Sequence, residues 1–204
     1  MQGWDVQALV TVFPDRPDSW MFHYPAIKWT GLQAQAAGLR QVSVPTSGVK
    51  EQEIEDLGHA LDKLKKSDGI EGVVSGAIVS EYQRTRLDNL CEKLDLRSFA
   101  PLWHKNQAGL VSDEIEAGFE IIVTACNALG LDQKWLGKRL GARELKELVE
   151  LNRKYGLNVA FEGGEAETFT LACPAFKTRL TVTRATPHWK GDSGYLDLEE
   201  VQAV

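Results

Sequence analysis

The chain has few cysteines, and none of them forms a metal or disulfide motif. Its 204 residues include only Cys91, Cys126 and Cys173, which are widely spaced and form no CxxC pair. Disulfide frameworks and zinc sites need sets of cysteines at short, regular spacings, so neither is indicated. The sequence also contains no GxGxxG fingerprint, no zinc signature and no Ser-His-Asp order typical of a serine hydrolase.

Long hydrophobic runs and an excess of positive charge are absent as well. No apolar run approaches the roughly 18 residues needed to cross a bilayer, and no basic-then-apolar leader opens the chain. The sequence therefore predicts a soluble cytoplasmic protein with no membrane partner. The 29 acidic and 23 basic side chains give a net charge of −6, which argues against general binding of nucleic-acid phosphates. A specific contact with a nucleoprotein or a translation factor stays open.

Strand-like and helix-like patterns alternate over the first half of the chain, which indicates a parallel α/β sheet. The opening segment Trp4–Phe13 is expected as a strand, and its nearly continuous apolar run Ala8–Phe13 predicts that this strand is parallel and covered on both faces. A helix is expected to stop at Gly38, a usual C-terminal cap. The later elements are expected as a strand over 39–44, a helix over 51–66, a strand over 72–79, a helix after Ser80 and a last segment over 97–103.

The second half has a different pattern, and it predicts an α+β domain. A short helix is expected near 112–118, followed by an apolar run over 119–125 and a helix over 142–155. Alternating segments near 169–171, 179–183 and 194–198 predict antiparallel strands. We therefore expect one domain over residues 1–104 and a second, smaller one over 105–204.

The most distinctive segment is Glu162-Gly163-Gly164-Glu165-Ala166-Glu167-Thr168, which lies between two strand-like runs. The glycines permit positive φ angles and close approach of another group. On an extended segment Glu165 and Glu167 would point to one face. Such acids can hold a metal, an amine or another cation. A polar hairpin turn explains the same spacing equally well, so both interpretations stay open on the residues alone.

A second candidate site follows the predicted third strand. The end of a parallel strand that leads into a capped helix is where open α/β sheets bind ligands. Helix N-terminal amides at Ser80 suit a phosphate, and Arg84 or Arg86 can pair with it. A well-capped packing helix with solvated arginines is the alternative. His23 and Trp103 lie in aromatic, proline-bounded segments, where packing and substrate orientation are both open.

Together these segments resemble one family, the diphthine–ammonia ligases with an ATP-pyrophosphatase fold. The residues that carry the resemblance are Ser19–Pro25, Gly76–Arg86, Pro101–Trp103 and Glu162–Phe169. The resemblance implies an α/β, parallel-sheet nucleotide-binding domain of the HUP type, truncated at its N-terminus and followed by a substrate-recognising α+β domain. It also implies ATP and Mg²⁺ as cofactors, and as partners ammonium and a translation elongation factor that carries diphthine.

The resemblance implies roles for individual residues. Those expected to be catalytic are Glu162, Glu165 and Glu167, with their separate roles undivided. Those expected to contact the substrate are His23, Trp103, Gly163, Gly164 and Thr168. Those expected to contact the nucleotide are Ser75, Gly76, Ser80, Tyr82, Gln83 and Arg84. The implied reaction is adenylation of the diphthine carboxylate, followed by displacement of AMP by ammonia. An acidic pocket lined by aromatic rings would suit the trimethylammonium group of diphthine.

The sequence departs from the family in one respect. Members normally begin with a strand and a Ser-Gly-Gly-Lys-Asp-Ser pyrophosphate loop, and this chain has no such loop. Met1-Gln2-Gly3 resembles the end of the helix that follows this loop, so a late start or a truncation is expected, with weak or absent ATP turnover. Two other interpretations therefore stay open beside a diphthine–ammonia ligase: an ATP-dependent amide ligase that acts on another carboxylate, and an inactive binding module.

Overall fold

The computed structural model describes residues 3–15, 26–47 and 52–204, so the expected site residue His23 lies outside the described part. The chain divides into two compact units. Unit 1 contains Met1–Ile27 and Leu39–His104, and unit 2 contains Lys28–Gly38 and Lys105–Val204. Each unit has its own buried hydrophobic cluster. The prediction that each half of the chain has a separate function stays a prediction.

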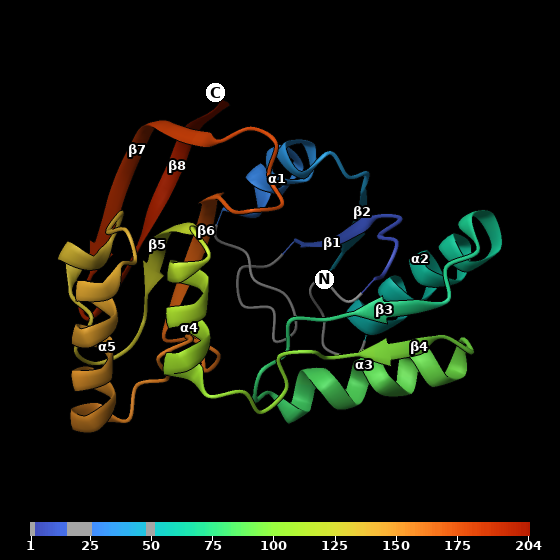
Figure 1. Ribbon diagram of the computed structural model, residues 1–204, viewed down its shortest axis with the longest axis horizontal. Coiled ribbons are helices and arrows are strands. Elements are labelled where there is room, and N and C mark those ends of the chain that lie inside the picture. The colour runs from blue at the N-terminus through green and yellow to red at the C-terminus, as the bar shows by residue number, and fades with distance from the viewer. Residues whose placement is uncertain (1–2, 16–25, 48–51) are drawn as a thin grey trace. The chain divides into compact units, whose positions relative to one another are not determined.

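Unit 1 contains two pairs of parallel strands. β1 (Leu9–Pro14) pairs with β2 (Gln41–Thr46), and β3 (Gly72–Val74) pairs with β4 (Arg97–Phe99), as Figure 1 shows for the second pair. The parallel α/β pattern predicted for the first half is therefore confirmed. β1 is less covered than its apolar sequence predicts, since Leu9 is 38% exposed.

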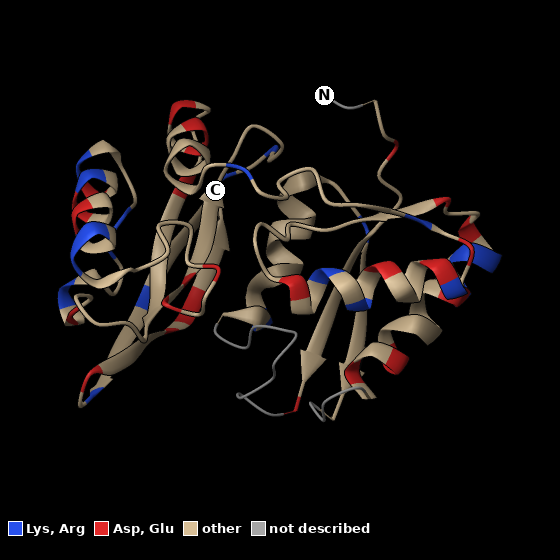
Figure 2. Ribbon diagram, turned by 90° about the horizontal axis from the view of Figure 1, so that it is seen from below, with Lys and Arg blue, Asp and Glu red and all other residues tan. Residues whose placement is uncertain are grey.

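Two helices supply the core of unit 1. They are α2 (Gln52–Asp68) and α3 (Glu81–Lys93), and their buried leucines pack with Val12 of β1 and Val44 of β2. α2 has acidic residues in its first turn and Lys65 and Lys66 in its last, as the sequence predicts for a helix stabilised by its dipole. Acidic and basic residues are interspersed along the helices rather than gathered into one basic face (Figure 2).

The strand predicted over 72–79 is wrong beyond Val74. Ser75 still donates its backbone N–H to Phe99 O at 2.9 Å, and the chain then leaves the sheet. Ala77 and Ile78 are buried within unit 1 at 7% and 6% exposure, so their apolar character reflects packing of a connecting segment. A short apolar run cannot by itself distinguish these two outcomes.

Unit 2 is built on a four-stranded sheet in the order β6-β5-β8-β7. Its strands are β5 (Glu120–Cys126), β6 (Ala166–Ala172), β7 (Leu180–Lys190) and β8 (Ser193–Ala203), and all are antiparallel to their neighbours. The antiparallel arrangement predicted for the second half is confirmed. The last two strands are longer than predicted because they form one continuous hairpin around Gly191, whose φ is +64°.

The helices of unit 2 are α4 (Gln107–Glu116), α5 (Ala142–Tyr155) and α1 (Thr30–Ala37). Figure 1 shows α4 and α5 side by side. α4 begins earlier than the predicted residue 112, because Asn106 caps it by accepting the N–H of Gly109 at 2.8 Å. α1 ends at Gly38 with φ 69°, as predicted, and packs against β7 and β8.

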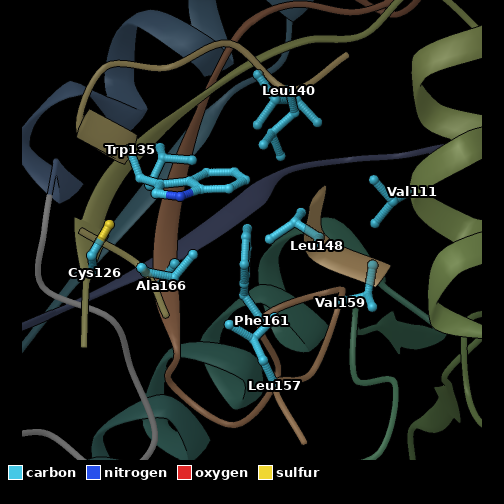
Figure 3. Close-up of a cluster of buried hydrophobic side chains, with 12 residues drawn as sticks. Val111, Cys126, Trp135, Leu140, Leu148, Leu157, Val159, Phe161 and Ala166 are labelled. Atoms are coloured by element: carbon cyan, nitrogen blue, oxygen red, sulfur yellow. The ribbon is translucent and has the colours of Figure 1, made fainter. Parts of the chain in front are cut away.

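The core of unit 2 lies under α4 and α5. Leu148 of α5 is completely buried there, and Figure 3 shows it beside Phe161 and Trp135, which come from other parts of the chain. Trp135 lies in the 3-10 turn η2 (Gln133–Trp135), which the sequence patterns did not predict. The short turn η1 (Ile27–Trp29) leads into α1.

Candidate functional site

The acidic Gly-Gly segment forms a tight turn that leads into β6. Phe161 has φ +62° and Gly164 has φ +79°, and Gly164 N–H bonds to Phe161 O at 3.2 Å. A positive φ is uncommon for a side chain as large as Phe, and here the ring is held at 8% exposure in the core (Figure 3). The buried ring of Phe161 therefore anchors this end of the turn in the core of unit 2.

The carboxylate of Glu165 holds this turn together. It accepts the backbone N–H of Asn158 at 3.0 Å and of Gly163 at 2.8 Å. A Cβ at Gly163 would lie 2.7 Å from Oε1 of Glu165, so only glycine lets the carboxylate approach so closely. The Gly-Gly pair thus has two distinct causes: close approach at Gly163 and positive φ at Gly164.

Three amide side chains outside the motif brace the same turn. Asn127 donates its side-chain N–H to Gly164 O at 3.3 Å, and its backbone N–H to Glu165 O at 2.7 Å. Gln107 accepts the N–H of Val159 at 3.2 Å, and Asn158 accepts that of Ala160 at 3.0 Å. No sequence pattern pointed to these three residues, because single Asn and Gln side chains carry no spacing signal.

The three glutamates differ in position. Glu167 lies within β6, opposite Ala125 of β5, whereas Glu165 precedes the strand and turns its carboxylate back to the amides of the turn. The common face expected for an extended segment therefore does not describe this pair. Thr168 follows Glu167 and is exposed, and Glu162 is half-buried in the turn.

The second candidate site, in unit 1, is a capped helix start. Ser80 accepts the N–H of Gln83 at 3.4 Å and forms the N-cap of α3, as predicted. Among the residues that the structure describes, no atom would lie within 4 Å of a Cβ at Gly76, so these residues leave its backbone open to approach. The C-terminal end of β3 is thus followed by Ser75, Gly76 and the first turn of α3, which contains Tyr82 and Gln83. In open α/β sheets, ligands bind beyond the C-terminal ends of the parallel strands.

Arg84 already has partners in this segment. Its Nε lies 3.3 Å from Asp88, and its guanidinium carbon lies 4.4 Å from the ring centroid of Trp103. Trp103 also stacks on His104, whose N–H bonds to Ile78 O at 2.8 Å. The structure therefore brings Trp103 to the predicted nucleotide residues of unit 1. Arg86 lies over the Tyr82 ring at 3.6 Å.

Metal and thiol chemistry find little support in the described residues. Within residues 3–15, 26–47 and 52–204, no three His, Cys, Asp or Glu side chains cluster as a metal site. The Glu165 carboxylate is directed at two backbone amides, so the acidic turn does not fit the ligand set expected for Mg²⁺. Burial raises the pKa of Cys126 to about 12 and raises that of Cys91, so both thiols are protonated and unreactive at neutral pH.

The fold and the site define a class. It is a mixed α/β protein in which a unit with parallel strands and a Ser80-capped helix is combined with an antiparallel unit that carries an acidic Gly-Gly turn. No helix in the described part of the chain is long and apolar enough to cross a membrane.

Comparison with known proteins identifies the family. The profile described as "Diphthamide synthase N-terminal domain" matches residues 1–98, and "Diphthamide synthase C-terminal domain" matches residues 106–204. The chain belongs to the diphthamide synthase family. It is 40% identical over 200 residues to "Diphthine--ammonia ligase" of Rattus norvegicus, covering 89% of this chain and 74% of that protein. The Danio rerio protein of the same name is 38% identical over 202 residues, covering 88% of this chain and 77% of that protein.

A more distant relative has the same name. The Saccharomyces cerevisiae "Diphthine--ammonia ligase" is 34% identical over 152 residues, which are 67% of this chain but only 22% of that protein.

Proposed function

We propose that this chain is an ATP-dependent ligase that converts diphthine on a translation elongation factor to diphthamide, with ammonium as the nitrogen source. The observation that carries the proposal is the match to both diphthamide synthase domains together with about 40% identity to proteins named diphthine–ammonia ligase. The rigid turn built around Glu165 supports it, since a binding site needs its groups held in place.

The chemistry has two balanced steps. A carboxylate is a poor acyl donor, so a carboxylate oxygen of diphthine attacks the α-phosphorus of ATP and pyrophosphate leaves. Ammonia then attacks the acyl carbon of the adenylate. The C–O bond to AMP breaks, and the nitrogen loses a proton as the amide forms. Apart from the protons that ammonium and the new amide nitrogen release to solvent, each step forms one bond and breaks one, and no oxidant or reductant is needed.

We assign nucleotide binding to the parallel unit, as a HUP-type domain. The N-terminal amides of α3 and the open backbone at Gly76 are suited to bind an anionic group. The other residues proposed to contact the nucleotide are their neighbours in the sequence: Ser75, Ser80, Tyr82, Gln83 and Arg84. Because Arg84 also contacts Asp88 and Trp103, its planar guanidinium is held in one orientation before any ligand arrives.

We assign substrate binding and the reacting centre to the acidic turn. Glu167 and Glu162 are the carboxylates proposed to act on ammonium or on the substrate cation, whereas Glu165 is proposed to position the turn through its two amide contacts. Gly163, Gly164 and Thr168 would then present backbone and hydroxyl groups to the substrate. His23 and Trp103 keep their proposed substrate contacts, Mg²⁺ would accompany ATP, and the reaction would occur in the cytoplasm.

The test combines the purified chain with ATP, ammonium and a diphthine-bearing elongation factor. The enzyme is used at a concentration equal to that of the substrate, so that a single turnover is enough to be detected. The proposal expects AMP and amidated factor in equal amounts, both dependent on ammonium. AMP formed only with a different carboxylate would indicate the alternative ligase, and binding of the factor without AMP would indicate a binding module.

A further inference from the structure

Two rows of directly paired residues cross the sheet of unit 2 next to the Gly-Gly turn. The first row, from β6 to β7, is Glu167, Ala125, Tyr195 and His188. The second row is Ala166, Cys126, Gly194 and Trp189. Directly paired residues point to the same face of a sheet and successive residues point to opposite faces, so the two rows face opposite sides.

The second row faces the core under α4 and α5. Cys126 and Ala166 belong to the buried cluster, and Trp189 packs against it. A Cβ at Gly194 would lie 2.4 Å from the Trp189 ring, which confirms that the two side-chain positions share this face. The first row therefore lies on the opposite face. Asp197, two residues after Tyr195, shares that face and receives Lys28 Nζ at 2.9 Å.

The first row combines aromatic rings with a carboxylate. The His188 and Tyr195 rings stack with centroids 4.8 Å apart and an interplanar angle of 22°, and Tyr195 is 49% exposed. His188 covers the Tyr195 ring from the β7 side, so the other ring face is directed along the row to Glu167. Ala125 is the residue paired between Tyr195 and Glu167, and two strand spacings separate the backbones of Tyr195 and Glu167 by about 10 Å.

This combination suits a quaternary ammonium. Such a group has no N–H to donate, so ring faces and nearby negative charge bind it, whereas a primary ammonium needs hydrogen-bond acceptors. Glu167 supplies the negative charge from the motif itself, and Asp197 lies on the same face. We propose that Tyr195, His188 and Glu167 form the subsite for the trimethylammonium group of diphthine. This inference rests on the proposed function for the identity of the substrate.

The experiment uses the full chain and choline as the probe. Its uncharged isostere, in which a tert-butyl group replaces the trimethylammonium, is the matched control ligand. Titrations followed by NMR are expected to shift the resonances of Tyr195, Ala125 and Glu167 with choline only. Tyr195→Ala should raise the Kd about fivefold, whereas Tyr195→Phe keeps the ring and should stay within about twofold. Tyr155→Ala, which removes an exposed ring from α5, should leave the Kd unchanged.

Equal binding of choline and its isostere would overturn the proposal, and so would an unchanged Kd in Tyr195→Ala. The amidation assay separates this failure from failure of the proposed function. Amidation of diphthine with an unchanged KM in Tyr195→Ala would refute the subsite and leave the function standing. Choline binding that depends on Tyr195, without any amidation of diphthine, would refute the function and leave the subsite standing. If the proposed function and the subsite are both correct, the KM for diphthine-bearing factor rises in Tyr195→Ala while kcat is retained.

Discussion

Replacing Glu165 tests whether its carboxylate holds the Gly-Gly turn. In Glu165→Ala the backbone N–H groups of Asn158 and Gly163 lose their acceptor. A hydrogen bond to a charged group is worth about 1.5–3 kcal/mol, which would give about 3–6 kcal/mol for two. The amide of Gly163 is exposed and recovers a bond to water, so we expect a loss of about 2–4 kcal/mol in the stability of the turn.

Hydrogen exchange measures this loss at the two amides directly. A loss of 2–4 kcal/mol corresponds to exchange about 30-fold or more faster at Asn158 and Gly163. Glu165→Gln retains one acceptor oxygen and should fall between the wild type and Glu165→Ala. Glu150→Ala removes an exposed carboxylate from α5 and serves as the control. Unchanged protection of both amides in Glu165→Ala would refute the positioning role.

The same variant separates positioning from chemistry. If Glu165 acts by holding the turn, Glu165→Gln should retain measurable amidation, whereas Glu167→Gln should lose it while exchange at Asn158 and Gly163 stays slow. Amidation that is lost equally in both, with the amides of the turn still protected in Glu165→Gln, would show that Glu165 takes part in the chemistry itself.

Three further predictions concern the stability of unit 2. Thr124 is fully buried and, in the described structure, its hydroxyl has no hydrogen-bond partner, so Thr124→Val should raise the free energy of unfolding by about 1 kcal/mol; urea denaturation showing a loss would contradict this. Leu148→Ala should cost about 2–5 kcal/mol in the same assay, because it empties the centre of the core; a loss below about 1 kcal/mol would show that the core closes over the space. Burial raises the pKa of Glu114, so folding favours its protonated form. The contribution of this protonation to the free energy of unfolding is therefore fully present below the ordinary pKa of glutamate, and it is lost as the pH rises through the raised pKa of the folded state. Glu114→Gln should therefore stabilise the protein at neutral pH and have no effect near pH 4, and an equal effect at both would contradict this reasoning.

Local signals in the sequence were enough to predict several features of the fold. Gly38 ends α1 with a positive φ, and Ser80 caps α3, because each needs only its own backbone or a neighbour three residues away. The parallel pattern of the first half and the antiparallel pattern of the second follow from runs of apolar residues and from alternation. The segment 75–79 was beyond such reasoning, since Ala77 and Ile78 are buried outside any strand.

The sequence by itself determined where the acidic Gly-Gly segment lies and which family it resembles, because both depend on residues adjacent in the chain. The tertiary structure alone decided that Glu165 bonds to the amides of its own turn, because two backbone groups must fold back to meet it. It also decided that Glu167 shares a face with Tyr195 and His188. Strand register brings these residues together across the sheet, and no local pattern of side chains encodes the register of distant strands.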